Sequence, residues 1–131
     1  RMKEMIDVAH SYGARIMYHS CGSVRAIIPD LIEIGVEILN PVQPRAAGMD
    51  PKGLKKDFGD KLTFYGTIDE QETLPYGKPE DVKAEVLERI RYMAPGGGFI
   101  ISPCHSIQPD TPLENIMALY NTALEYGVYK K

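Results

Sequence analysis

Residues 79–102 read PEDVKAEVLERIRYMAPGGGFIIS and show most clearly how the chain alternates between two kinds of secondary structure. Residues 79–93 are predicted to form a helix, because proline opens the segment, acids follow it, and apolar residues recur every three or four positions. The glycines at 96–98 predict a turn, and the apolar run at 99–102 predicts a strand. The stretch therefore predicts a helix that leads directly into a strand.

The same alternation of helix and strand extends over the whole chain. Strands are predicted at 14–18, 36–40, 62–66 and 99–102, and helices at 2–12, 27–34, 51–58, 79–93 and after Thr111. Strands that alternate with helices favour a parallel sheet, since each parallel crossover needs a connection of helix size. Pro29 is expected to kink or restart its helix, and Pro41 is expected to stop the second strand.

The last helix has a predicted start and a predicted buried side. Thr111 would be its N-cap residue, and Glu114 follows three positions later, which is the pattern of a capping box. Helical spacing then predicts a buried stripe of apolar side chains, formed by Leu113, Ile116, Met117, Tyr120 and Leu124. Gly127 would end the helix.

The number of strand–helix units indicates the architecture. Four units are half of an eightfold barrel, so we expect an α/β fold in which residues 1–131 form the C-terminal half, about four βα units, of a (β/α)8 TIM barrel. The chain opens with Arg1 inside a predicted helix, so the N-terminal half of the barrel would be absent. Polar residues gather just after the predicted strands, where active sites of such folds are built: His19, Cys21, Asn40, Gln43, Asp69, His105 and Gln108.

The composition excludes several classes of function. With 15 Lys+Arg against 18 Asp+Glu the net charge is −3, which gives no basic footprint for nucleic acid. No apolar run approaches the roughly 18–20 residues of a membrane span. Two cysteines are too few for a disulfide framework, so the expected setting is reducing and cytoplasmic.

His19 and Cys21 form the sharpest chemical pattern in the chain. Residues two apart on an extended segment point to the same side, so the pair would present a nitrogen and a sulfur to one ion. Zinc accepts these ligands, and a catalytic zinc needs only three protein ligands and an open position. Cys104, also just after a strand, is the candidate third ligand. The alternative is a histidine at a strand end with two free thiols that behave as small apolar groups.

Five motifs, the first of which contains His19 and Cys21, carry a resemblance to a known family. They are His19-Ser20-Cys21-Gly22, Asn40-Pro41-Val42-Gln43, Tyr65-Gly66-Thr67-Ile68-Asp69, Pro95-Gly96-Gly97-Gly98-Phe99 and His105-Ser106-Ile107-Gln108-Pro109-Asp110. In this order they resemble the uroporphyrinogen decarboxylase superfamily over essentially the whole chain. The resemblance implies an eightfold barrel and a position at the C-terminal end of a longer protein.

The superfamily implies two activities. Its decarboxylases remove carboxylates from a tetrapyrrole in porphyrin biosynthesis without a metal or cofactor. Its methyltransferases use zinc held by His-x-Cys and a distant Cys to move a methyl group between a corrinoid (cobalamin) protein and a small-molecule thiol or methylated substrate. The resemblance therefore implies zinc on His19, Cys21 and Cys104, a methylcorrinoid carried by a partner protein, and methyl transfer as the leading function.

One departure from the zinc pattern leaves the third ligand open. His105 falls where the decarboxylases carry a late histidine and where the distal cysteine of the zinc enzymes would stand, whereas Cys104 comes one residue earlier. An offset of one residue at a strand end turns a side chain to the opposite face. Either the loop bulges to bring Cys104 inward, or His105 is the third ligand, or no zinc binds.

The remaining candidates would bind substrate, and no residue is assigned as the catalytic group. Candidate substrate-binding residues are Asn40, Gln43, Asp69, His105 and Gln108, although such residues also commonly cap loops and turns. Arg25 would bind a carboxylate or phosphate, or simply lie on the surface.

The competing functions are uroporphyrinogen decarboxylation and an inactive module that binds a tetrapyrrole or corrinoid. Half a barrel would expose two sheet edges and half of its core, so we expect the fragment alone to self-associate. We also expect it to be inactive alone, because half of the site would be absent.

Overall fold

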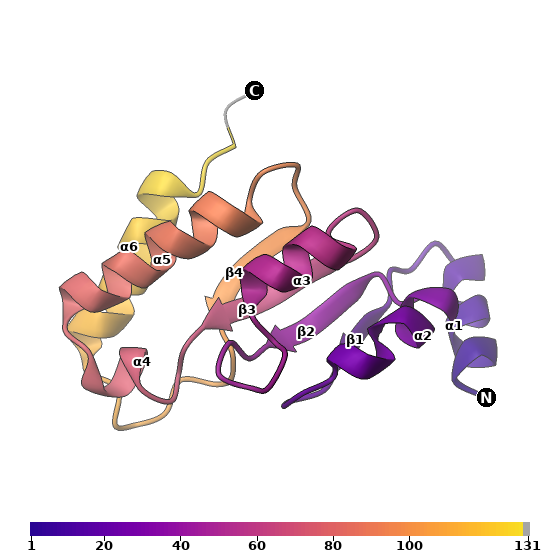
Figure 1. The fold of residues 1–131 in the computed structure, drawn as a ribbon, viewed down its shortest axis with the longest axis horizontal. Coiled ribbons are helices and arrows are strands. Elements are labelled where there is room, and N and C mark those ends of the chain that lie inside the picture. The colour runs from indigo at the N-terminus through magenta and orange to yellow at the C-terminus, as the bar shows by residue number, and fades with distance from the viewer. Residues whose placement is uncertain (130–131) are drawn as a thin grey trace.

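Four parallel strands pair side by side in chain order in the computed structural model, which describes residues 1–129. They are β1 (Met17–His19), β2 (Ile38–Val42), β3 (Thr63–Ile68) and β4 (Phe99–Pro103). Figure 1 shows this sheet crossing the middle of the molecule. Because the strands are parallel, their carboxyl ends all lie at one edge of the sheet.

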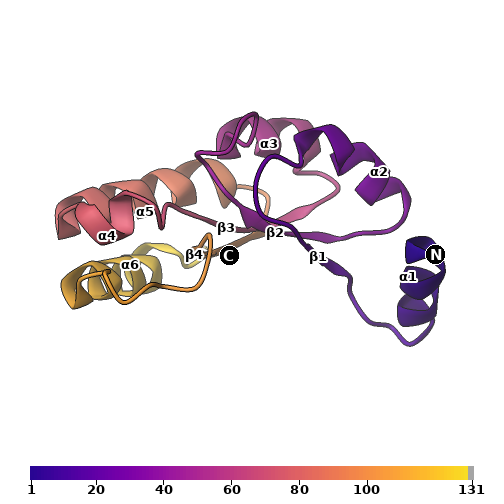
Figure 2. The same ribbon diagram turned by 90° about the horizontal axis from the view of Figure 1, so that it is seen from below.

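The helices follow the strands as the sequence predicts. They are α1 (Met2–Ser11), the 3-10 helix η1 (Arg25–Ile27), α2 (Ile28–Glu33), α3 (Pro51–Phe58), α4 (Thr73–Tyr76), α5 (Pro79–Met93) and α6 (Leu113–Tyr126). The predicted bounds of α3 and α5 are confirmed, and the helix restarts beside Pro29 as expected. Helices α2 and α3 cover one face of the sheet, while α1 and α6 lie at opposite ends of the molecule (Figures 1 and 2).

The second strand does not stop at Pro41, as the sequence analysis expected. Strand β2 continues through Pro41 to Val42, and its register with β3 shifts between Leu39 and Val42. A proline has no N–H to donate, so sheets accept it at such bulges. The irregular pairing explains why the strand tolerates Pro41 and delivers Gln43 to the site edge.

The start of α6 also differs from the prediction. The helix begins at Leu113 after Pro112, whose φ of −60° and ψ of 140° place it in extended backbone just outside the helix. Thr111 therefore lies one residue too early to face the free N–H groups of the first turn. Among the side chains that the structure describes, none caps this helix, so the predicted capping box is wrong.

The core lies in two clusters, and each includes a residue of β3. The first, between the sheet and helices α2 and α3, is centred on Leu39, Phe64 and Leu54, all fully buried. The second joins β3 to α4, α5 and α6 and consists of Ile68, Leu74, Val82, Val86 and Leu119. Because both clusters include residues of β3, this strand is the one held most firmly by the core. The candidate site is built around the carboxyl end of β3.

The predicted buried stripe of α6 is mostly exposed. Four of its five side chains face solvent: Leu113, Met117, Tyr120 and Leu124. The buried side of the helix instead carries Asn115, Leu119 and Thr122. The reason is geometric: α6 packs mainly against α5 and α4, so the side that meets these helices is the side that is covered.

Candidate functional site

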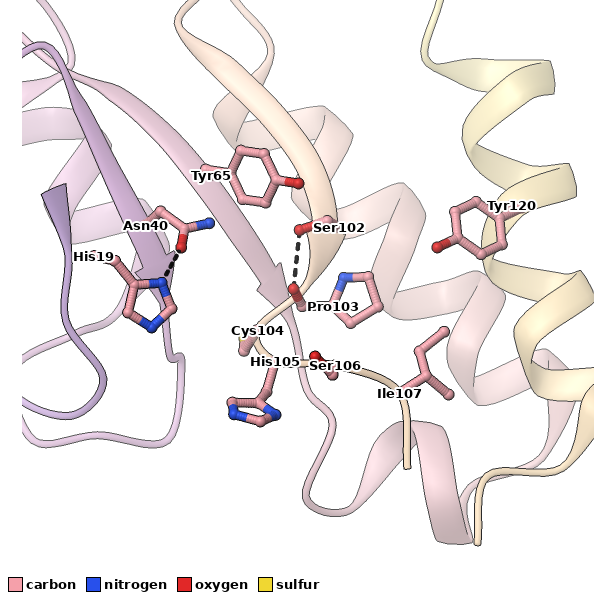
Figure 3. A pocket seen from close by; sticks show the side chains of 10 residues that line it. All are labelled: His19, Asn40, Tyr65, Ser102, Pro103, Cys104, His105, Ser106, Ile107 and Tyr120. Atoms are coloured by element: carbon pink, nitrogen blue, oxygen red, sulfur yellow. Dashed lines mark hydrogen bonds between the residues drawn. The ribbon is translucent and has the colours of Figure 1, made fainter. Parts of the chain in front are cut away.

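A cavity of about 480 Å³ opens at the carboxyl ends of the strands. Its walls come from all four strands, from the loop after β4 and from α6, as Figure 3 shows. The lining residues are His19, Asn40, Tyr65, Ser102, Pro103, Cys104, His105, Ser106, Ile107 and Tyr120. Three sequence-predicted residues that stand far apart in the chain (His19, Asn40 and His105) thus share one cavity with Cys104.

His19 is held in one orientation at this cavity. Its Nδ1 lies 2.6 Å from Oδ1 of Asn40, its register partner on β2, and Figure 3 marks this contact. The amide oxygen accepts, so the ring donates from Nδ1 and leaves Nε2 as an acceptor or ligand atom. That Nε2 lies 3.8 Å from Sγ of the exposed Cys21.

Gln43 fixes the turn that follows β1. Its side-chain oxygen accepts a hydrogen bond from the backbone N–H of Gly22, the residue after Cys21. Gly22 has a φ of +84°, in the left-handed region that favours glycine. The predicted substrate-binding residues Asn40 and Gln43 therefore both support the His19–Cys21 pair in this structure, one through the imidazole and one through the backbone.

Cys104 lines the same cavity, but its thiol is engaged with another group. Its side chain is buried, and its thiol donates a hydrogen bond to the backbone carbonyl of Val42 over 3.0 Å. Its own backbone N–H donates to the carbonyl of Ile68 over 3.0 Å. Burial raises the pKa of the Cys104 thiol, and the nearby carboxylate of Glu70 raises it further. Cys104 is thus a protonated thiol that ties the end of β4 to β2 and β3.

His105 is the next residue, beyond the end of β4, and it is exposed. Its Nδ1 lies 3.9 Å from Oε2 of Glu70, whose side chain is only 13% exposed. Burial raises the pKa of Glu70, while the neighbouring His105 lowers it. A second cavity of about 400 Å³, lined by Glu70, Tyr76, His105, Gln108 and Asp110 among others, adjoins on this side.

The other predicted site residues contact protein groups other than His19 and Cys21. Asp69 is buried at the end of β3, where its carboxylate accepts from the backbone N–H of Gln71 over 2.9 Å and from Arg45 over 3.3 Å. Gln108 donates to the carbonyl of Ser106 over 2.7 Å, within the loop after β4. Arg25 is paired with Asp57.

Sequence reasoning missed Glu70. This residue follows Asp69 directly after a predicted strand, so its position at the carboxyl ends of the strands could have been predicted from the sequence. The burial of its side chain beside His105 could not be predicted from the sequence, because it depends on how the loops after β3 and β4 pack together.

The donor set fits zinc only in part. Nitrogen from His19 and sulfur from Cys21 are suitable donors, and Asn40 orients the imidazole as partners of metal-bound histidines do. The buried thiol of Cys104 is instead engaged with the carbonyl of Val42. Across residues 1–129, no three His, Cys, Asp or Glu side chains gather closely enough to hold a metal ion.

The sequential parallel sheet and the polar side chains at its carboxyl edge define the class: an α/β protein whose site lies where the strands end. Within that class the chain belongs to the uroporphyrinogen decarboxylase (URO-D) family, whose model matches residues 1–126. None of the helices within residues 1–129 combines the length and the apolar composition that a membrane span requires.

Similar proteins point to the methyltransferases of this family. The methylcobamide:CoM methyltransferase MtaA of Methanosarcina barkeri is 36% identical over 108 residues, which cover 82% of this chain and 30% of that protein. The uroporphyrinogen decarboxylase of Coxiella burnetii is 24% identical over 74 residues, which cover 56% of this chain and 20% of that protein. The chain thus spans less than a third of the length of these relatives.

A solved structure gives the same indication. A methyltransferase from Methanosarcina mazei superposes with a TM-score of 0.72 at 28% identity, covering 96% of this chain and 36% of that one. The predicted α/β fold, with four parallel βα units of the barrel type found in this family, is confirmed.

Proposed function

We propose that the protein takes part in methyl transfer between a corrinoid protein and a thiol or methylated substrate, in the cytoplasm. Residues 1–131 would be the C-terminal part of a TIM barrel. The observation that carries this function is the His19–Cys21 pair at the carboxyl edge, with Nε2 and Sγ 3.8 Å apart. The 36% identity to a methylcobamide:CoM methyltransferase supports it.

In this proposal a C–S bond forms as the Co–C bond of the methylated corrinoid breaks. The electron pair of that bond stays with cobalt, and the proton of the thiol is released. A zinc ion would supply the charge that keeps a coordinated thiol as the thiolate at neutral pH.

The residues of this chain position the reactants. His19 and Cys21 would hold the metal, Asn40 keeps the His19 ring in one orientation, and Gln43 holds the turn that carries Cys21. The cavity of about 480 Å³ beside them provides room for a small thiol such as CoM. Its apolar wall, which includes Ile107 and Tyr120, would limit the access of water to the thiolate.

The proposal is tested by elemental analysis of the purified chain beside a Cys21→Ser variant. About one zinc per chain in the wild type, lost in the variant, is the expected result. Calorimetric titration of the zinc form with CoM should then show saturable binding with release of the thiol proton, since a metal-bound thiol is deprotonated. Neither measurement requires turnover by this part of the barrel.

A chain that lacks zinc and does not bind CoM would favour the decarboxylase reaction over methyl transfer. His105 lines the cavity, as the late histidine of a decarboxylase would, and a decarboxylase is among the relatives at 24% identity. A wild-type chain that holds no zinc after purification without chelators, and that binds a porphyrinogen but not CoM, would replace methyl transfer by this second candidate.

A further inference from the structure

The carboxyl end of β3 contains a strained residue. Thr67 has a φ of +83°, in the left-handed region, where a β-branched side chain is sterically disfavoured. Gly66, just before it, has a φ of +110°, and a Cβ at this position would lie 3.2 Å from the backbone nitrogen of Val42 and 3.3 Å from Pro41. The chain therefore needs glycine at 66, whereas at 67 it keeps a costly conformation that surrounding contacts must enforce.

An ion pair on the neighbouring helix α5 makes these contacts. Nε of Arg89 donates to the carbonyl of Thr67 over 3.1 Å, and the backbone N–H of Asp69 donates to Oε1 of Glu85 over 3.1 Å. Arg89 and Glu85 are joined to each other over 2.9 Å, and their side chains are only 16% and 10% exposed. The pair thus holds the backbone on both sides of Ile68.

The segment held in this way supports the wall of the candidate site. The carbonyl of Ile68 accepts from the backbone N–H of Cys104 over 3.0 Å, at the point where β4 has ended. Cys104 and His105 then line the cavity that also contains His19. Hydrogen bonds that involve a charged group are stronger than neutral ones, so the ion pair is suited to hold a strained backbone. Contacts made by the outer helix α5 therefore reach the site through Ile68.

We infer that Glu85 and Arg89 are positioning residues, which hold the strained end of β3 and thereby keep Cys104 in place in the cavity wall. The inference deepens the proposed function, and it rests on that function only for the role of the cavity. The side chain of Thr67 does not compensate for the strain, because its buried hydroxyl has no hydrogen-bond partner within residues 1–129. A glycine at 67 would adopt the same backbone without strain and would depend less on the ion pair.

The reactivity of Cys104 toward an aromatic disulfide reagent reports how firmly this wall is held. The chain has two cysteines, of which Cys21 is exposed and Cys104 is buried, so one thiol should react fast and one slowly. Arg89→Ala should raise the slow rate by at least about tenfold, since loss of a charged hydrogen bond shifts a local opening equilibrium by that order. Glu85→Gln keeps an acceptor for Asp69 but loses the charge, so its effect should be smaller.

Thr67→Gly provides a readout that a merely structural role of Arg89 would not change. With glycine at 67 the strain is absent, so the factor by which Arg89→Ala raises the slow rate should fall by at least about threefold. Val86→Ala is the matched control, because it removes buried packing from the same helix and leaves the ion pair intact. Its slow rate without denaturant should stay within about twofold of the wild type. Circular dichroism of each variant checks that the sheet is intact.

Two results would overturn the inference. An unchanged slow rate in Arg89→Ala would show that Cys104 is held without help from α5. An acceleration that is the same with and without Thr67→Gly, and that Val86→Ala reproduces, would show that Arg89 contributes only to overall stability. The titration with CoM reports on the proposed function separately, so its failure would leave the result on the positioning residues standing.

Discussion

Helices α5 and α6 pack against each other, yet their apolar sides have opposite environments. In α5 the side chains of Val82, Val86 and Met93 are buried, as the spacing of the sequence predicts. In α6 the corresponding stripe, which includes Tyr120 and Leu124, faces solvent. Helix α5 has α3, the sheet and α6 around it, whereas α6 packs mainly against α5 and α4. Apolar periodicity thus predicts a helix, but the neighbours decide which side is covered.

The exposed stripe of α6 contributes to an accessible surface that is larger than expected for a compact monomer of this mass. The accessible area of the chain is 7960 Å², whereas a compact monomer of 14.6 kDa exposes about 6900 Å². The excess, about 1000 Å², is similar to the roughly 800 Å² that each partner buries in a stable interface. We therefore propose that the isolated chain self-associates through α6 and the open edge at β4.

The largest expected difference between the two helices is in stability. Val86→Ser in α5 should lower the free energy of unfolding by about 2–4 kcal/mol, because it removes buried methyl groups and buries a hydroxyl. Leu124→Ser in α6, at a side chain that is 76% exposed, should change it by less than about 0.5 kcal/mol. Urea unfolding of both variants at low protein concentration measures the difference. Equal losses would show that Leu124 is covered in solution.

The next effect comes from the polar contact that holds α6 in place. Asn115 is buried, and its side-chain nitrogen donates to the carbonyls of Leu74 and Gly77, each over 2.8 Å. Asn115→Ala leaves these carbonyls without their donor, so we expect a loss of about 2–3 kcal/mol in the free energy of unfolding. The exposed Asn121 on the same helix provides the matched control, since Asn121→Ala should be close to neutral. A neutral Asn115→Ala would show that packing alone holds α6.

Self-association gives a smaller but more specific readout. The double substitution Tyr120→Ser and Leu124→Ser removes two exposed apolar side chains from α6, so the dissociation constant should rise at least about tenfold. Light scattering over a range of concentrations measures it. Val8→Ser on α1 tests whether the opposite end takes part. A monodisperse wild-type monomer at all concentrations would contradict the proposed interface.

What the sequence predicts well is local. Helix α5 has its own start signal and a stripe with neighbours on several sides, so its bounds and its buried face both follow from residues 79–93. Pro41 was misjudged because the bulge that accommodates it depends on the pairing with β3. The site residues show the same difference between features set by local sequence and features set by contacts between distant segments. The position of His19, Asn40 and His105 at one edge was predictable from the strand ends, whereas the burial of Cys104 depends on contacts with Val42 and Ile68 from two other strands.

The smallest predicted effect on stability concerns the other end of the sheet. Helix α1 is also poorly covered there, and polar contacts take the place of apolar packing. The Glu37 carboxylate accepts from the backbone N–H of Ile16 and from the side chains of Arg15 and His10. The hydrogen bond from Ile16, followed by that from Arg15, lowers the pKa of Glu37 from its ordinary value of 4.5. The stability it contributes is therefore present above pH 4.5 and lost as the pH falls through the lowered pKa.

Glu37→Gln should accordingly cost at most about 1 kcal/mol at pH 7. The difference from the wild type should narrow below pH 4.5 and vanish in stronger acid. Thermal unfolding between pH 3 and 7 would measure it, with Glu33→Gln as a control at an exposed carboxylate. A difference that stays constant over this range would mean that the charge of Glu37 contributes nothing.

The order of the strands also has a consequence for how the chain folds. Each strand pairs only with its neighbours along the chain: Tyr18 with Leu39, Leu39 with Phe64, and Phe64 with Phe99. Loop-closure entropy grows with the length of chain between partners, so pairing in chain order keeps these separations shorter than any other strand order of a parallel sheet would. On the ribosome, β2 can pair with β1 as soon as it emerges, and each later unit docks on the one already made. The sheet is therefore expected to grow in the direction of synthesis, and its last edge forms with α6.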